Sequence, residues 1–375
     1  MQRRIRLISA ALAATTALGL LPSTPAVAAP QPAQLHTFGS NGQLNTSEQF
    51  APPGATPVIG AFDAELGDDI IWYTPGAGGD AFWSSNQDGT WTASALSVSG
   101  TYTPYVGSFG GHDDGLDVLW YSTTGASQLW DFQDPEGGLV KTPLPTVTGT
   151  GTILIGDFTT DGATDIVRYR PGAPVEQWWD FDHPEEGTGP DLTTRTFSVG
   201  GTYTPIVGAF HTDTISGDYG ADILWYAPGS TADSLWDFDP HATFTKTALA
   251  INGTFTPIVA QWVADAAADI LWYAPGAAAD SLWDFNEGTN TVQKTPLTIN
   301  GTYTPYACSC FNSGSGDRWD ILWHGVGNAP DALWSIKGST FSPTSYSYPG
   351  TSIRGSKVVL PSLDGDRYQA VISYG

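Results

Sequence analysis

A unit of about 50 residues recurs along this chain, and it constrains the fold more than any other feature. The stretch 220–238, GADILWYAPGSTADSLWDF, returns almost unchanged at 268–285 as ADILWYAPGAAADSLWDF. Looser copies are centred on single positions separated by 48, 48, 57, 47, 51 and 50 residues: Trp72, Trp120, Arg168, Trp225, Trp272, Trp323 and Ser373. Such a period is typical of one supersecondary unit used many times, as in a propeller or a stacked array.

Each repeat predicts four short strands. In the fifth repeat the first strand is expected at 256–260, the second at 269–273 and the third at 281–285, with Pro275-Gly276 as a turn between the last two. The second strand is apolar on both faces, as expected for a strand buried between neighbouring sheets. The fourth strand carries charged residues that blunt an exposed strand edge, so it is predicted to form the outer rim: Lys141, Arg195, Lys246 and Lys294.

The two ends of the chain predict how the ring closes. Residues 33–38 align with the third strand of a repeat, so the mature chain is expected to begin in mid-repeat, whereas 351–375 supplies only a first half. These halves are complementary. The sequence therefore predicts an all-β, seven-bladed propeller of four-stranded blades over 30–375, its last blade closed by N- and C-terminal strands. A linear array would need polar caps at both ends, and the split repeat disfavours it.

Residues 1–29 are predicted to be a secretory signal peptide, because Arg3, Arg4 and Arg6 precede the apolar stretch 7–21 and the small residues 26–28. The apolar part is too short to span a membrane. The formal net charge of −24 disfavours nucleic acid and anionic lipid as partners. We expect a secreted, extracellular monomer without membrane insertion.

One loop carries a full set of oxygen ligands. In GDFTTDGATDI, residues 156–166, the side chains of Asp157, Thr159, Asp161 and Asp165 and the carbonyl of Ala163 are spaced to surround one ion. Oxygen donors of this kind suit a hard cation, above all Ca²⁺. Partial copies occur in the first and last repeats: Asp63, Glu65, Asp69, Asp364 and Asp366. In the other repeats a lone aspartate precedes the second strand, and its carboxylate is expected to accept backbone N–H groups.

This loop resembles the calcium loop of the FG-GAP or VCBS repeats of integrin-like β-propellers. The resemblance covers the mature chain at the level of the repeat, although the complete acidic loop occurs once. It implies a secreted or surface propeller used for binding, with structural Ca²⁺, and it does not single out a ligand.

Two columns of tryptophans follow the second and third strands. Exposed rings could stack on sugars, but a large ring at the same place in nearly every repeat is better explained by packing between sheets. Departures from the repeat are therefore the better candidates for ligand binding: Arg168, Tyr169, Arg170, Trp178, His211 and His324.

The sequence favours a non-enzymatic binding propeller that recognises carbohydrate or a cell-surface polymer through repeated weak sites. No Gly-x-Ser-x-Gly, His-Glu-x-x-His or paired-cysteine motif is present. Two alternatives stay open. One is an extracellular polysaccharide-degrading lyase or hydrolase that uses Arg168, Tyr169, Arg170 and a histidine. The other is a purely structural, calcium-stabilised module.

Overall fold

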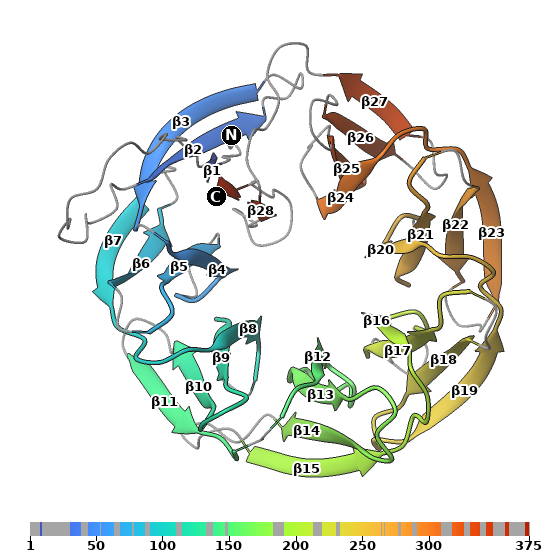
Figure 1. Ribbon diagram of the computed structural model, residues 1–375, viewed down its shortest axis with the longest axis horizontal. Coiled ribbons are helices and arrows are strands. Elements are labelled where there is room, and N and C mark those ends of the chain that lie inside the picture. The colour runs from blue at the N-terminus through green and yellow to red at the C-terminus, as the bar shows by residue number, and fades with distance from the viewer. Residues whose placement is uncertain are drawn as a thin grey trace, which may run out of the picture.

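The computed structural model is a ring of six four-stranded antiparallel sheets, which we call blades 1 to 6 (Figure 1). It describes residues 8–9, 31–38, 44–52, 54–63, 68–76, 79–86, 91–109, 115–132, 138–146, 149–182, 191–212, 220–229, 233–263, 265, 267–276, 279–286, 291–308, 317–325, 331–337, 343–347, 357–359 and 372–374. In this part of the chain no helix is long and apolar enough to cross a membrane.

The blades follow one another along the chain. Blade 1 holds β4 (Thr56–Gly60), β5 (Asp69–Tyr73), β6 (Asp80–Ser85) and β7 (Trp91–Leu96), and blade 2 holds β8 (Thr103–Gly107), β9 (Asp117–Tyr121), β10 (Gln128–Phe132) and β11 (Leu139–Pro143). Blade 3 holds β12 (Thr152–Gly156), β13 (Asp165–Tyr169), β14 (Glu176–Asp182) and β15 (Asp191–Phe197). Blade 4 holds β16 (Thr204–Gly208), β17 (Asp222–Tyr226), β18 (Asp233–Phe238) and β19 (Phe244–Leu249). Blade 5 holds β20 (Thr256–Ala260), β21 (Asp269–Tyr273), β22 (Asp280–Phe285) and β23 (Val292–Leu297), and blade 6 holds β24 (Tyr303–Cys308), β25 (Asp317–Gly325), β26 (Ala332–Lys337) and β27 (Pro343–Ser347).

The prediction of seven four-stranded blades is wrong. β28 (Lys357–Val359) and β29 (Ile372–Tyr374) form a three-stranded sheet with β1 (Ile8–Ser9), while β2 (Gln31–Phe38) and β3 (Leu44–Ala51) form a separate hairpin. The predicted closure needed β2 to pair with β29. Instead β1 pairs in parallel with the edge of β29, and β2 pairs along its whole length with β3. Figure 1 shows these small sheets between blades 6 and 1.

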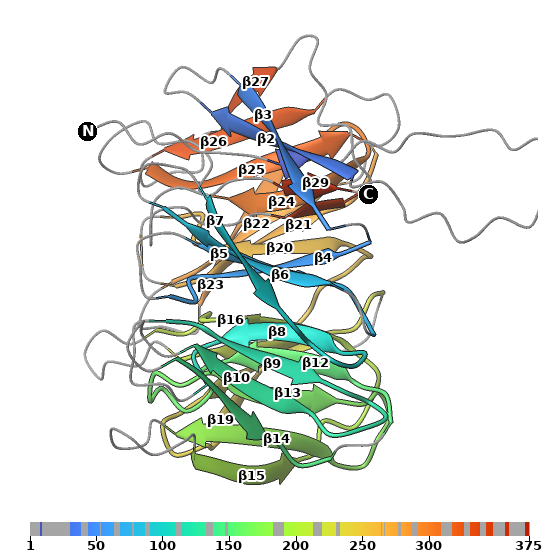
Figure 2. The same ribbon diagram turned by 90° about the vertical axis from the view of Figure 1, so that its left-hand side faces the viewer.

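Within a blade the strands run outward in chain order, so the fourth strand lies on the rim, as predicted (Figure 1). The second strands β5, β9, β13, β17 and β21 are buried at every position, because they have a blade on each side. β19 and β23 on the rim have no buried residue, and half of their residues are exposed. In Figure 2 the outer strand β7 crosses steeply over the inner strand β4, which is the twist expected of a sheet.

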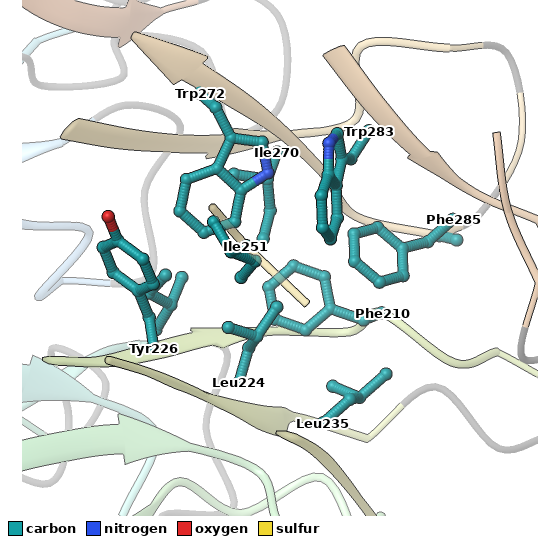
Figure 3. Close-up of a cluster of buried hydrophobic side chains, with 11 residues drawn as sticks. Phe210, Leu224, Tyr226, Leu235, Ile251, Ile270, Trp272, Trp283 and Phe285 are labelled. Atoms are coloured by element: carbon teal, nitrogen blue, oxygen red, sulfur yellow. The ribbon is translucent and has the colours of Figure 1, made fainter. Parts of the chain in front are cut away.

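Apolar side chains fill the wedge between neighbouring blades. Between blades 4 and 5, Leu224 and Tyr226 of β17 face Ile270 and Trp272 of β21, and Phe210 meets Phe285 (Figure 3). Burial of rings of this size supplies most of the free energy that holds one blade on the next.

Candidate functional site

In blades 1 to 5 the second strand begins at an aspartate on one face of the ring and ends at a tyrosine on the other. We call these the loop face, where the first strand joins the second, and the turn face, where the second strand joins the third. The predicted ligands are thereby separated, because the acidic loop of blade 3 lies on the loop face whereas Tyr169 ends β13 on the turn face.

The aspartate that opens the second strand of blades 1 to 5 accepts hydrogen bonds from backbone N–H groups. In blade 5, Asp269 Oδ2 accepts the N–H of Val263 at 2.8 Å, and Oδ1 accepts the N–H of Phe285 at 3.1 Å. Burial raises the pKa of Asp269 to about 7. The equivalent carboxylates Asp69, Asp117, Asp165 and Asp222 also accept backbone N–H groups. The expectation of this backbone role is confirmed.

The acidic loop of blade 3 is folded around its own carboxylates. Asp157 accepts the N–H groups of Asp161 at 3.2 Å and of Gly162 at 2.9 Å, and Asp161 Oδ1 accepts the N–H of Ala163 at 2.8 Å. Asp165 accepts the N–H groups of Phe158 and Phe181 at 2.9 and 3.0 Å, and its Oδ2 lies 3.4 Å from the hydroxyl of Thr159. All five predicted ligand residues therefore lie in one turn.

Burial and the negative charge of Asp161 raise the pKa of two neighbouring carboxyl groups, Asp157 and Asp182. Burial is the larger cause of the raised pKa of Asp157, and the negative charge of the neighbouring Asp161 raises this pKa further. The pKa of Asp182, at the end of β14, is also raised, mainly by burial and secondly by the charge of Asp161. Sequence reasoning missed Asp182, although its position directly after the third-strand motif could have revealed it. Crowding of negative charge is relieved when a cation binds.

The donor chemistry of the loop suits Ca²⁺, because Asp157, Thr159 and Asp161 supply only oxygen and a carboxylate oxygen that accepts one N–H keeps a second lone pair. Among the described residues, however, no group of three or more His, Cys, Asp or Glu side chains is gathered closely enough to hold a metal. The loop would have to tighten around an ion.

The partial copies of the acidic loop bring together fewer of the predicted metal ligands. In blade 1, Asp63 accepts a hydrogen bond from the hydroxyl of Ser84 at 2.5 Å, and Asp69 has the backbone role described above. Glu65, Asp364 and Asp366 lie outside the described residues.

On the turn face, Tyr169 ties blade 3 to blade 4. Its hydroxyl donates to the carbonyl of Gly201 at 3.2 Å and accepts the N–H of Tyr203 at 2.7 Å. Tyr73, Tyr226 and Tyr273 make the same two bonds to the turn that enters the next blade. Tyr169 thus belongs to the repeat and is not a departure from it.

The other candidate residues do not converge. Trp178 is 2% exposed and packs edge-on against Phe238. Arg170 donates through Nη2 to the carbonyl of Val175 at 2.5 Å on the surface. His211 of blade 4 has Nδ1 3.3 Å from Asp237 Oδ2, and His324 of blade 6 has Nδ1 2.9 Å from Asp331 Oδ1. These histidines lie on different blades from the arginines, and His211 is on the loop face.

Both tryptophan columns are packing residues, as predicted. The five second-strand rings are at most 1% exposed: Trp72, Trp120, Trp225, Trp272 and Trp323. On the third strands, the ammonium groups of three rim lysines cover the tryptophan rings at 3.5 to 3.6 Å from the ring centroids. The second-strand rings are therefore closed to solvent, and Trp130, Trp236 and Trp283 have a ring face covered by lysine.

Arg168 is the candidate around which the structure forms a pocket. The pocket is a small hollow between blades 2 and 3 that is lined mainly by apolar surface. Arg168, only 5% exposed, donates through Nη1 to Gln177 Oε1 at 2.8 Å and through Nη2 to the carbonyl of Gly149 at 2.8 Å. The remaining lining residues were not predicted: Tyr121, Ile153, Ile166, Gln177 and Trp179.

The comparisons with known proteins concern the fold. No protein-family model matches the chain, and no curated protein matches its sequence. A solved structure of a protein from Lactobacillus plantarum is similar with a TM-score of 0.58 and 12% identity over 92% of this chain and 95% of that one. A lectin from Agrocybe aegerita that recognises non-reducing terminal N-acetylglucosamine is similar with a TM-score of 0.63 and 13% identity over 84% and 87%.

A provisionally named 6-phosphogluconolactonase from Bacteroides fragilis is similar with a TM-score of 0.53 and 10% identity over 91% of this chain and 93% of that one. At such identities the likeness concerns architecture alone, because one fold hosts many functions. The chain is an all-β propeller.

Proposed function

We propose that this protein is a secreted, non-enzymatic propeller of the FG-GAP or VCBS type that binds carbohydrate or a cell-surface polymer. In this proposal residues 1–29 are removed on export, which takes β1 away from the edge of β29, and 30–375 act as a single domain. The observation that carries it is the interruption of the repeat at Arg168, which stands at the position of the second-strand tryptophan and donates to Gln177 and to the carbonyl of Gly149. The likeness to a lectin of the same fold supports the choice of carbohydrate.

Packing explains most of the remaining conspicuous residues. The tryptophan columns, Tyr169 and the opening aspartates all have partners within the repeat. A binding site is therefore expected where the repeat is interrupted, and such a site uses hydrogen bonds rather than ring stacking.

A glycan array probed with the full secreted chain tests the binding function. We expect binding to a restricted set of glycans. Gly151→Tyr/Arg168→Trp introduces the residue types that blade 2 has at the equivalent positions, Tyr102 and Trp120. This variant should bind at least tenfold more weakly, the loss that follows from removing a charge-assisted hydrogen bond. A folded chain that binds no glycan would favour the structural-module alternative. Equal binding by the variant would place the carbohydrate site elsewhere.

We further propose that the acidic loop of blade 3 holds a structural Ca²⁺ through Asp157, Thr159 and Asp161. The crowding of Asp157, Asp161 and Asp182 supports this proposal, since a divalent cation would offset their mutual repulsion. The bound ion would fix the loop between β12 and β13. No reaction is assigned to it.

Calcium is expected to raise the thermal unfolding temperature of the wild-type chain, and a chelator to lower it. At a free calcium concentration 100 times Kd the gain is about 2.7 kcal/mol. Asp161→Asn should abolish the response. The matched control is Asp265→Asn: Asp265 holds the same position in the blade 5 loop, but Gln261 and Val263 replace the other two ligands. An equal calcium response in wild type and Asp161→Asn, measured by calorimetry, would refute the site.

A further inference from the structure

The third strand of blade 3 brings two further carboxylates to the acidic loop of the same blade. Asp180 and Asp182 of β14 are separated by one residue, so their side chains leave the strand on the same side. Asp182 interacts with Asp161 of the loop through a side-chain hydrogen bond. Asp161 and Asp182 are exposed, whereas Asp180 is 0% exposed. The side of β14 that carries these carboxylates therefore faces the loop.

One oxygen of Asp180 lacks a hydrogen-bond donor. Its Oδ2 accepts the Nε–H of Arg195 on β15. Its Oδ1 is buried, and among the described residues it has no hydrogen-bond partner. A buried carboxylate oxygen without a donor is costly, because it has given up its bonds to water. Such an oxygen points to a bound ion or water as its partner.

The other blades indicate where this oxygen points. In blade 1 the counterpart of Asp180 is Ser84, whose hydroxyl donates to Asp63, the third residue of the loop between the first and second strands. The same two positions lie 3.3 Å apart in blade 4, where they are His211 and Asp237. In blade 3 the third loop residue is Thr159, which is 7% exposed. Asp180 and Thr159 are therefore expected to form the buried floor of the acidic loop.

The contact between Asp182 and Asp161 joins two acidic groups. At the position of Asp182, three other blades use the side chain to bond a threonine in the turn before the fourth strand: Asn86 to Thr92, Asp239 to Thr243, and Asn286 to Thr291. In blade 3 this position contacts the acidic loop. Two carboxylates so close repel each other unless a proton or a cation lies between them.

We propose that the Ca²⁺ ion of blade 3 is shared between the loop and the third strand, with Asp180 Oδ1 and the carboxylate of Asp182 as ligands. This inference rests on the proposed calcium site and extends it beyond Asp157, Thr159 and Asp161. The side chains then supply four carboxylates and one hydroxyl. Ca²⁺ takes about six to eight oxygen ligands, whereas Mg²⁺ keeps several waters and usually binds only one or two carboxylates. The ligand set therefore favours Ca²⁺.

The charges around the loop are consistent with a divalent ion. Burial, followed by the charges of Asp180 and Asp161, raises the pKa of Asp165 to about 8. Arg195 contacts Asp180 and lowers the pKa of Asp182. A single guanidinium leaves most of the negative charge of this cluster in place, and a bound Ca²⁺ would offset it.

A shared ion predicts that calcium orders β14 as well as the loop. Amide hydrogen exchange of the full chain, measured by mass spectrometry with Ca²⁺ and with chelator, tests this prediction. We expect calcium to slow exchange in both 157–165 and 176–182, because both segments are then held by the same ion. The equivalent strand of blade 5, β22, is the internal control and should exchange at the same rate in both conditions.

Isothermal titration with Ca²⁺ measures the contribution of each β14 carboxylate. Asp180→Asn should weaken calcium binding about tenfold or more, and Asp182→Asn about threefold to tenfold, since water can partly replace an exposed ligand. The matched control is Asp284→Asn, at the position of Asp180 in blade 5, where Gln261 and Val263 replace two of the loop ligands. This variant should bind calcium like the wild type.

Asp182→Asn keeps the test decisive if Asp180→Asn unfolds, because Asp182 is exposed at the end of its strand. Wild-type calcium affinity in the folded β14 variants, with protection from exchange confined to 157–165, would overturn the shared site and leave a site made by the loop alone. A wild-type chain that binds no calcium would overturn both calcium proposals. Neither result depends on the glycan array, so the carbohydrate proposal is judged separately.

Discussion

Replacing Trp272 by alanine is expected to lower the free energy of unfolding by about 3–5 kcal/mol, the cost of removing a fully buried large aromatic side chain. Trp272 is 1% exposed and lies 5.0 Å from the ring of Tyr226 and 5.5 Å from that of Trp283 (Figure 3). Trp272 therefore packs against residues of both blade 4 and blade 5. Chemical denaturation followed by far-UV circular dichroism measures the change.

This substitution also separates packing from sugar binding. Thr298 is exposed next to the buried Ile299 in the same blade, and Thr298→Ala should change stability by less than about 0.5 kcal/mol. If Trp272 were a carbohydrate platform, its replacement would abolish binding and leave stability intact. That outcome would contradict the packing role.

The repeat could be predicted in detail from sequence because its strands depend on local patterns. The four apolar residues 270–273, which follow Asp269 and precede Pro275-Gly276, correspond to β21 and the turn after it. The lysines placed on the rim, Lys246 and Lys294, lie on the fourth strands β19 and β23. Each of these features is decided within a few residues by apolar periodicity and turn chemistry.

The number of blades could not be predicted in the same way. Closure depends on which strand pairs with the edge of β29, and pairing between distant segments leaves no mark on local pattern. Residues 33–38 align with a third strand, yet they pair with the following residues as a β-hairpin, whose loop closure involves only a short segment. The edge of β29 is paired instead with Ile8–Ser9.

The candidate site was partly predictable. Arg168 stood out as a departure from a tryptophan column, but Tyr169 looked equally unusual beside it and turned out to make the bonds of the repeat. Gly151 is the sequence feature that could have distinguished Arg168 from its neighbours. Aligning GTYTP at 100–104 with GTGTI at 149–153 shows the loss of an aromatic residue, and only the packing shows that Arg168 fills that space.

Replacing Asp280 by alanine is the second large effect, because one carboxylate joins three segments of blade 5. Its Oδ1 accepts the N–H of Ala274 at 2.8 Å, directly after β21, and its Oδ2 accepts the N–H of Ile299 at 2.7 Å, after β23. The side chain is 1% exposed. Alanine leaves two buried N–H groups without acceptors, each costing about 1–3 kcal/mol, so we expect a loss of about 2–5 kcal/mol in the free energy of unfolding.

The equivalent aspartate of blade 4 provides a second test of this prediction. Asp233 makes the same two bonds in blade 4, to Ala227 and Ile251, so Asp233→Ala should cost a similar amount. The exposed Gln293→Ala on the rim of blade 5 is the control and should have little effect. Asp280→Asn retains one acceptor oxygen and should fall between alanine and wild type. Equal stability of Asp280→Ala and Gln293→Ala in denaturant titrations would contradict the prediction and show that water can replace the carboxylate.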